Sequence, residues 1–182
     1  MQIHICTSNA NKVREFERIL GISLTSSGID VDEIQSIDTE EVCRRKAEAA
    51  FAALGHPVLV DDTGFELSAL DGFPGALVTW ALKGGTTAIL HRMLPPSADE
   101  GAKVVTAIGY ADEAGVHAFC GAVAGTVIAV PRGANGFGFD EVFVPEGETR
   151  TLAEMSDAEK DAISPRGIAL ASLAAFLRER VA

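Results

Sequence analysis

Residues 57–62, PVLVDD, restrict the fold of this chain more than any other segment. Their apolar side chains follow one another without alternation, which is typical of a strand covered on both faces. A strand of this kind is expected inside an α/β fold, where helices pack against a sheet. The run ends in two adjacent acids, Asp61 and Asp62, which are costly to bury unless they hold a cation or accept hydrogen bonds.

Strands and helices are predicted to alternate before this strand. The first strand, 2–7, leads into a helix with an apolar face that ends at Gly21. Residues 29–35 alternate between apolar and polar side chains, which predicts a half-buried strand. A second helix is predicted over 38–54, because an apolar stripe follows a cluster of acids at its start.

The second half of the chain is predicted to be richer in strands. A helix around 86–93 precedes two or three strands within 103–128, the first two joined as a hairpin. A glycine-rich loop with a short strand follows over 131–147. A helix over 156–163 opens with a Ser-x-x-Glu capping box, and the last helix runs over 164–180. The whole pattern predicts an α/β fold with a mixed sheet.

Composition narrows the classes of function. The 182 residues contain no repeat or obvious linker, so we expect a single domain over 1–182. No run of 18 apolar residues and no secretory signal is found, so neither a membrane partner nor export is expected. The odd number of scattered cysteines suits a reducing cytoplasm. The net charge of −11 disfavours nucleic acid as a partner, and requires any small anion to be held by local cations.

The turn between the first strand and the first helix has the chemical content of a phosphate-binding site. It offers hydroxyls, amides, a helix N-terminus and a lysine. Its residues are Thr7, Ser8, Asn9, Ala10, Asn11 and Lys12. The alternative interpretation is a plain helix cap beside a surface lysine.

Carboxylates at the ends of two predicted strands could hold a metal ion. Asp62 and its neighbour end one strand, and Glu33 lies at the end of another. Hard oxygen ligands suit Mg²⁺, which takes one or two carboxylates together with substrate phosphates. The alternative is that the strand simply ends in a solvated acidic turn.

Two further segments could contact a ring-bearing, phosphorylated ligand. Gly136 to Asp140 carry two phenylalanine rings that could stack on a base, or could belong to the core. Lys46 and Lys160 could bind phosphate, or could be ordinary solvated lysines. Near the last helix, Ser164 is expected to be the N-cap and Pro165 the first helical residue.

Arg166 would then stand in the first turn of the last helix, next to a helix end that is already partly positive. A cation in this position indicates an electronegative partner nearby. The alternative is an exposed arginine at the start of a helix. Taken with the carboxylates, lysines and rings, the residues describe a metal-assisted site for a phosphorylated ligand.

Four segments together resemble the inosine triphosphate pyrophosphatase family, also called the Ham1 family. They occur in the family's order and cover almost the whole chain. They are TSNANK (7–12), VDDTGFELSALDGFPG (60–75), GFGFDEVFVPEG (136–147) and TLAEMSDAEKDAISPRGIAL (151–170). The resemblance implies a mixed central sheet with flanking helices and two lobes around a nucleotide-binding cleft. It also implies a homodimer.

The resemblance implies a reaction that the residues alone leave open. ITP, dITP or XTP would be cleaved to the monophosphate and pyrophosphate by a metal-activated water that attacks the α-phosphate. Asp62 would be the general base and, with Glu33, would hold Mg²⁺, with Mn²⁺ as an alternative metal. Residues 7–12 and Lys46 would hold the phosphates. The nucleoside pocket would be lined by Thr63, Phe137, Gly138, Phe139, Asp140, Lys160, Ser164, Pro165 and Arg166, with the arginine donating to the 6-oxo oxygen.

Three positions depart from the family pattern. Pro165 stands where the family has histidine, Glu141 where it has proline, and Thr79 where a Lys or Arg often precedes an aromatic residue. We therefore keep two alternative functions beside that of an enzyme selective for ITP, dITP and XTP. One is a pyrophosphatase that also accepts ordinary bases, and the other is a nucleotide-binding module without catalysis.

Overall fold

The computed structural model describes residues 4–29 and 31–181 and is built on a sheet of seven strands. They are β1 (His4–Ile5), β2 (Thr25–Ser26), β3 (Val58–Leu67), β4 (Pro74–Gly75), β5 (Gly101–Asp112), β6 (Gly115–Val127) and β7 (Phe143–Pro145). Their order is β2-β1-β3-β5-β6-β7, and β4 pairs with β3 outside this path. The sheet is mixed, because β1 runs parallel to β2 and β3 while the other pairings are antiparallel.

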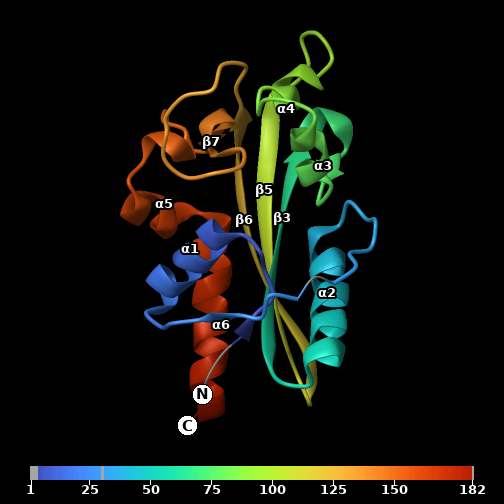
Figure 1. Cartoon of the computed structure of the whole chain (residues 1–182). Coiled ribbons are helices and arrows are strands. Elements are labelled where there is room, and N and C mark those ends of the chain that lie inside the picture. The colour runs from blue at the N-terminus through green and yellow to red at the C-terminus, as the bar shows by residue number, and fades with distance from the viewer. Residues whose placement is uncertain (1–3, 30, 182) are drawn as a thin grey trace.

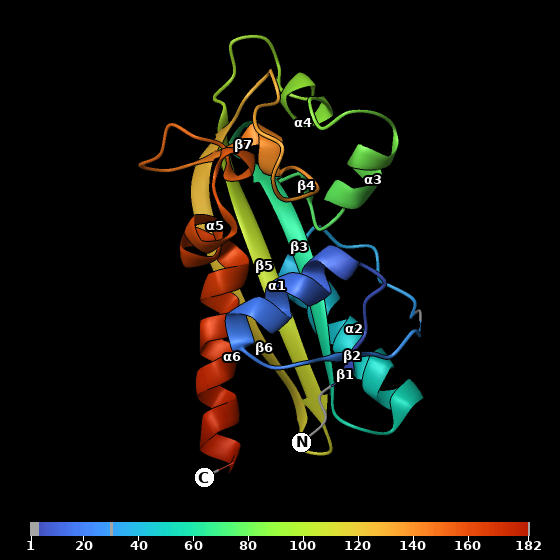
Figure 2. The ribbon, with the colours of Figure 1, turned by 60° about the vertical axis from the view of Figure 1, so that its left-hand side comes forward.

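Helices cover both faces of this sheet, as Figures 1 and 2 show. They are α1 (Ala10–Leu20), α2 (Thr39–Leu54), α3 (Val78–Lys83), α4 (Ile89–Arg92), α5 (Asp157–Ile163) and α6 (Pro165–Val181). α1 and α6 pack against each other on one face, and α2 packs against β3 and β5 on the other. Among the described residues, no helix is long and apolar enough to cross a membrane. The predicted α/β fold with a mixed sheet is confirmed.

The central strand β3 sends alternate side chains to the two faces. Leu59 packs in a buried cluster with residues of α1 and α6. Val58 and Val60 pack in a second cluster with residues of α2. The strand is therefore covered on both sides, as its uninterrupted apolar run predicts.

The predicted helix boundaries are confirmed where capping residues define them. The Asn9 side chain accepts hydrogen bonds from the backbone N–H groups of Asn11 and Lys12, at 3.0 and 3.4 Å. α1 ends at Gly21, whose φ of 67° is one that glycine adopts at little cost. α5 opens with the expected capping box between Ser156 and Glu159.

The strand predicted over 29–35 is wrong for the described residues of that segment. Residues 31–35 have no regular secondary structure, and Thr25–Ser26 occupies the position beside β1. Ile29 and Val31 nevertheless pack against the cluster under α2. The alternation therefore records an irregular segment lying against the core, and Glu33 does not end a strand.

The position predicted for the paired acids is also wrong, because β3 continues to Leu67 beyond them. β5 pairs with β3 along its length, from Val58 opposite Ala111 to Leu67 opposite Ala102. The acids consequently lie in the middle of a strand, where ion pairs compensate for their burial.

Other boundaries differ less. The segment 103–128 holds two long strands, and the helix predicted over 86–93 is reduced to α4. α3 lies in a stretch for which no helix was predicted. Of the strand predicted over 2–7, His4–Ile5 is a strand, and residues 2–3 lie outside the described part.

Candidate active site

A cavity of about 300 Å³ lies where the start of α1, the middle of β3 and the start of α6 meet. Most of the predicted site residues line it. They are Asn9, Asn11, Lys12, Asp62, Thr63, Phe137, Gly138, Phe139, Asp140, Lys160, Ser164, Pro165 and Arg166. Sequence reasoning missed its apolar wall, which comprises Val78, Leu82, Val104 and Leu152. Nothing in their pattern distinguishes these four side chains from ordinary core residues.

A second cavity of about 240 Å³ is lined by three further predicted phosphate-binding residues and by the predicted metal ligand Glu33. Thr7, Ser8, Glu33 and Lys46 line it. Ala10, the first residue of α1, is absent from the lining of both cavities. The two cavities therefore divide the predicted residues into a larger group around the rings and a smaller polar group around Lys46.

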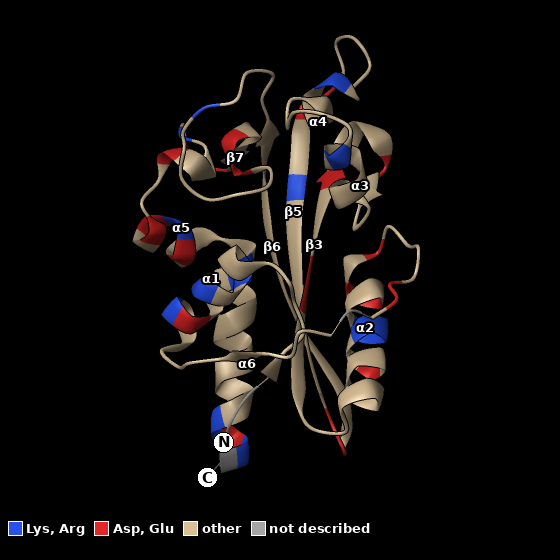
Figure 3. Cartoon of the chain, viewed as in Figure 1, with Lys and Arg blue, Asp and Glu red and all other residues tan. Residues whose placement is uncertain are grey.

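The side chains of the two adjacent acids of β3 lie in different surroundings, because successive side chains on a strand point to opposite faces. Asp61 lies on the side of α1 and α6, where it contacts Lys12 and Arg166. Asp62 lies on the side of α2, where its Oδ2 is 3.4 Å from the Lys46 ammonium. Figure 3 shows the acidic segment midway along β3. The acids do not form a pair for one cation.

Asp61 is 1% exposed and receives two cations on one carboxylate. Arg166 donates from Nε to Oδ2 at 3.0 Å and from Nη2 to Oδ1 at 3.4 Å. Lys12 forms an ion pair with Oδ1. Burial alone raises the pKa of Asp61, but the charges of Arg166 and Lys12 outweigh it and hold the pKa well below its ordinary value.

Glu15 extends this network of buried charges. Its carboxylate accepts hydrogen bonds from Arg166 Nη1 and, at 2.8 Å, from Lys160 Nζ. Lys160 also donates to Asp140 at 2.6 Å. Sequence reasoning missed Glu15, although its place three residues after Lys12 on α1 puts both side chains on one helix face. The electronegative partner expected for Arg166 is therefore a pair of acids, Glu15 and Asp61.

The Arg166 guanidinium has one N–H group that makes no hydrogen bond within the described chain. Its contacts with Asp61, Glu15 and Thr63 account for four of the five N–H groups within the described chain. The remaining N–H belongs to Nη1, and Arg166 lines the larger cavity. The residue is 6% exposed, so the interpretation as an exposed arginine is wrong.

Ser164 and Gly121 fix where α6 begins. The Ser164 hydroxyl accepts a hydrogen bond from the Gly167 backbone N–H at 3.0 Å, which confirms its predicted capping role. Gly121 on β6 lets the helix approach closely, because a Cβ there would lie 2.0 Å from the Pro165 carbonyl oxygen. This close contact fixes the position of the start of α6, and therefore of Arg166, relative to β6.

We expect Gly121→Ala to displace the start of α6 and to lower the free energy of unfolding by about 1–3 kcal/mol. The added methyl group would meet backbone atoms, which cannot rotate away. Urea unfolding measures the change. Gly84→Ala is the matched control, because a Cβ at Gly84 meets nothing within 4 Å. Equal stabilities for the two variants would contradict the close approach.

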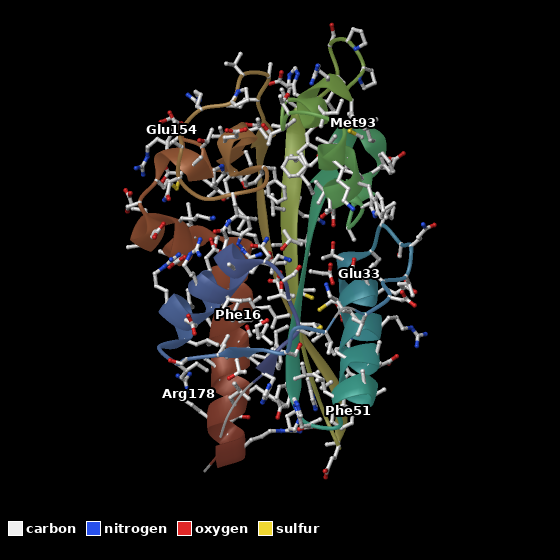
Figure 4. The ribbon with its side chains drawn as sticks, in the orientation of Figure 1. Phe16, Glu33, Phe51, Met93, Glu154 and Arg178 are labelled. Atoms are coloured by element: carbon white, nitrogen blue, oxygen red, sulfur yellow. The ribbon has the colours of Figure 1, made fainter. Side chains whose placement is uncertain are left out.

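Asp62 is a buried carboxylate beside the ammonium group of Lys46. Burial raises the pKa of Asp62 to about 6, although the Lys46 and Lys12 charges act in the opposite direction. Lys46 also forms an ion pair with Glu33, which Figure 4 places beside α2. Burial lowers the pKa of Lys46, but Asp62 and Glu33 reverse this and raise it.

The two phenylalanines of the glycine-rich loop differ in their surroundings. The Phe137 ring faces two cations, with the Lys160 Nζ 4.8 Å and the Arg166 Cζ 5.6 Å from its centroid. The Phe139 ring packs edge-on against Phe65 at 4.9 Å and is 9% exposed. Phe137 is therefore the better placed of the two to stack on a flat ligand, and Phe139 belongs mostly to the core.

The three departures from the family pattern lie at or near the larger cavity. Pro165 and Thr79 line it, and the next residue, Trp80, is 66% exposed. Glu141 accepts a hydrogen bond at 2.6 Å from the Thr87 hydroxyl, which joins the turn Asp140–Val142 to the segment before α4. This hydrogen bond joins two segments of the chain, and a proline at position 141 could not accept it.

Comparisons with known proteins place the chain in a family. The model of the Ham1 family matches residues 3–176. The chain belongs to the Ham1 family. An inosine triphosphate pyrophosphatase of Yarrowia lipolytica is 41% identical over 99% of this chain and 97% of its own. A dITP/XTP pyrophosphatase of Hyperthermus butylicus is 36% identical over 97% and 95% of the two chains.

A solved structure of a Ham1-family protein supports the fold independently. The Ham1 protein of Staphylococcus aureus superposes with a TM-score of 0.85 at 30% identity, covering 99% of this chain and 100% of that one. The similarity spans the whole Ham1 fold, including the segments that carry both cavities.

Proposed function

We propose that this protein hydrolyses the triphosphates of deaminated purine nucleosides, ITP, dITP and XTP, to the monophosphate and pyrophosphate. The names of its relatives support this proposal. One observation on this chain carries the proposal. Asp62 lines the same cavity as the start of α1 and as the two cations that face the Phe137 ring, Lys160 and Arg166. A base can thus bind at one end while its phosphates reach the carboxylate.

The base end is proposed to favour a 6-oxo purine. The free N–H of Arg166 would donate to the 6-oxo oxygen, and Phe137 would stack on the ring. Adenine presents an amino group at this position, so two donors would face each other without an acceptor. The site then rejects adenine because neither donor is satisfied.

The phosphate end is proposed to run from Lys12 toward Lys46. Asp62 lines the larger cavity and contacts Lys46, which lines the smaller one. The α-phosphate would lie at this junction, with the β- and γ-phosphates toward Thr7 and Ser8. The two lysines supply the positive charge that a protein of net charge −11 must concentrate locally.

The carboxylates at this junction fit a divalent cation. Oδ2 of Asp62 is buried and has no hydrogen-bond partner in the described structure, and Glu33 meets the same lysine. Within the described ranges, no three His, Cys, Asp or Glu side chains gather as metal ligands. Two carboxylates plus substrate phosphates suit Mg²⁺, and Mn²⁺ accepts the same ligands. When bound, the metal would neutralise the phosphates and activate water.

Asp62 is proposed to be the general base. Its carboxylate accepts a proton from a water whose oxygen attacks the α-phosphorus, and the bond to the bridging oxygen of the β-phosphate breaks. The nucleoside monophosphate and pyrophosphate then leave. In the metal-free protein the pKa of Asp62 is raised to about 6, so its carboxylate is ionised at pH 7 and can accept a proton.

The substrate range is tested by measuring pyrophosphate and monophosphate from ITP, XTP, dITP, GTP and ATP in parallel, with Mg²⁺ and with chelator. We expect metal-dependent release at least about 10-fold faster from the first three than from ATP. GTP shares the 6-oxo group, so its comparison with ITP isolates the effect of the 2-amino group. Equal release from every base would support the broader enzyme that Pro165 suggests. Tight ITP binding without release would support the non-catalytic module.

We also propose that the protein is a homodimer, as the family resemblance implies, and that it works in the cytoplasm, as its scattered cysteines favour. Size-exclusion chromatography with light scattering tests the assembly. A mass close to twice 19.1 kDa supports it, and a mass near 19.1 kDa at micromolar concentration contradicts it.

A further inference from the structure

Asp61 joins two cations that the proposed function places at opposite ends of the substrate. Its Oδ2 accepts from Arg166, which would contact the base, and its Oδ1 pairs with Lys12, which would contact phosphate. Lys12 also donates to the Asp61 backbone oxygen at 3.3 Å. Among the described acids, only Asp61 contacts both cations, since Glu15 bridges Arg166 and Lys160 instead.

Asp61 is buried more deeply than either cation. Its side chain is fully buried, and its backbone pairs with that of Ile108 in β5. Lys12 retains 17% side-chain exposure on a flexible stem. A fully buried carboxylate between two longer side chains sets the position of both.

Asp61 does not line the cavity itself, so it acts on substrate through its neighbours. We propose that Asp61 is a positioning residue that sets the spacing between base recognition by Arg166 and phosphate binding by Lys12. This inference rests on the proposed function. With that spacing, a nucleotide whose base is accepted by Arg166 has its α-phosphate at Asp62, and a poorly seated base draws it away.

The test compares Asp61→Asn with Asp61→Glu in the full chain with Mg²⁺, using ITP and ATP as probes. Asparagine preserves shape but removes the charge that both cations share. We expect kcat for ITP to fall about 100-fold, because misplacement of reacting groups by about 1 Å has effects of this size. KM should change less than about threefold, since Lys12 and Arg166 are still present. Asp61→Glu keeps the charge but moves it by one methylene group, so kcat should stay at least about 10-fold below wild type if the spacing matters.

Base discrimination gives a second readout that is independent of how much variant protein folds. The ratio of kcat/KM for ITP to that for ATP should fall about 10-fold in Asp61→Asn. Folded fraction cancels in this ratio, so misfolding alone cannot change it. Asp112→Asn is the matched control, because Asp112 pairs with Arg180, which lies about 21 Å along α6 from Arg166.

Three results would overturn the inference. They are an unchanged discrimination ratio in Asp61→Asn, a rise in KM that accounts for the whole loss, and an Asp61→Glu variant as fast as wild type. If wild-type protein releases no pyrophosphate from ITP, the proposed function itself fails. Active wild-type enzyme with an unaffected Asp61→Asn variant would reject only the role of Asp61.

Discussion

Asp62→Asn should lower the rate of pyrophosphate release at least about 10³-fold. The same substitution should stabilise the metal-free protein at neutral pH. Activity is lost because asparagine cannot accept the proton of the attacking water. Stability rises because the folded protein no longer buries a carboxylate whose pKa is raised from 3.8 to about 6. This shift corresponds to about 3 kcal/mol once the group is fully ionised.

The sign of the pH dependence follows from the raised pKa. Between pH 3.8 and about 6 the folded protein binds a proton at Asp62 that the unfolded chain has released. The free energy of unfolding therefore falls as pH rises through this window, and the difference between wild type and Asp62→Asn grows with it. The two proteins should be nearly equal in stability below about pH 4 and furthest apart above about pH 6.

Urea unfolding of chelator-treated protein at pH 4 and pH 7 measures this effect, and an ITP assay measures the activity. Asp112→Asn, remote from both cavities, should retain full turnover. An active Asp62→Asn enzyme would refute the proposed base. An inactive variant with unchanged stability at both pH values would instead show that the buried carboxylate carries no energetic cost.

Arg166→Met should lower the free energy of unfolding by about 3–5 kcal/mol. The substitution keeps much of the apolar side-chain volume but leaves Glu15 and Asp61 buried without the cation that they share. Removing one partner from a buried ion pair leaves an uncompensated charge, and this accounts for the size of the loss. Urea unfolding at pH 7 measures it.

Arg180→Met is the matched control within the same helix. Arg180 pairs with Asp112 but keeps 34% side-chain exposure, so water screens the pair. Its loss should cost less than about 1 kcal/mol. Similar losses in both variants would show that the buried network contributes no more than a surface ion pair.

The local chemistry of several elements is readable from single residues. Asn9, Gly21 and Ser164 mark helix ends through hydrogen bonds and backbone angles that depend on nearby atoms. The uninterrupted apolar run before Asp61 likewise indicates a strand that is buried on both faces. These features were predictable because each is decided within a few residues of the chain.

The order of the four family motifs also carries information beyond local structure. It indicates the Ham1 family and most of the polar residues around the larger cavity. The motif match assigned the general base to Asp62, but it could not show which cations Asp61 contacts, because those cations lie in distant segments. Glu15 lies between motif positions and was missed for that reason.

The sequence by itself determined the α/β class, the capped helices and most of the polar residues that line the two cavities. Only the tertiary structure decided that Asp61 joins Lys12 and Arg166 while Asp62 faces Lys46. The physical reason is the pleat of β3, which sends adjacent side chains to opposite faces, each covered by a helix from a distant part of the chain. The raised pKa of Asp62 follows from burial and from charges brought together in this way, and no local pattern contains that information.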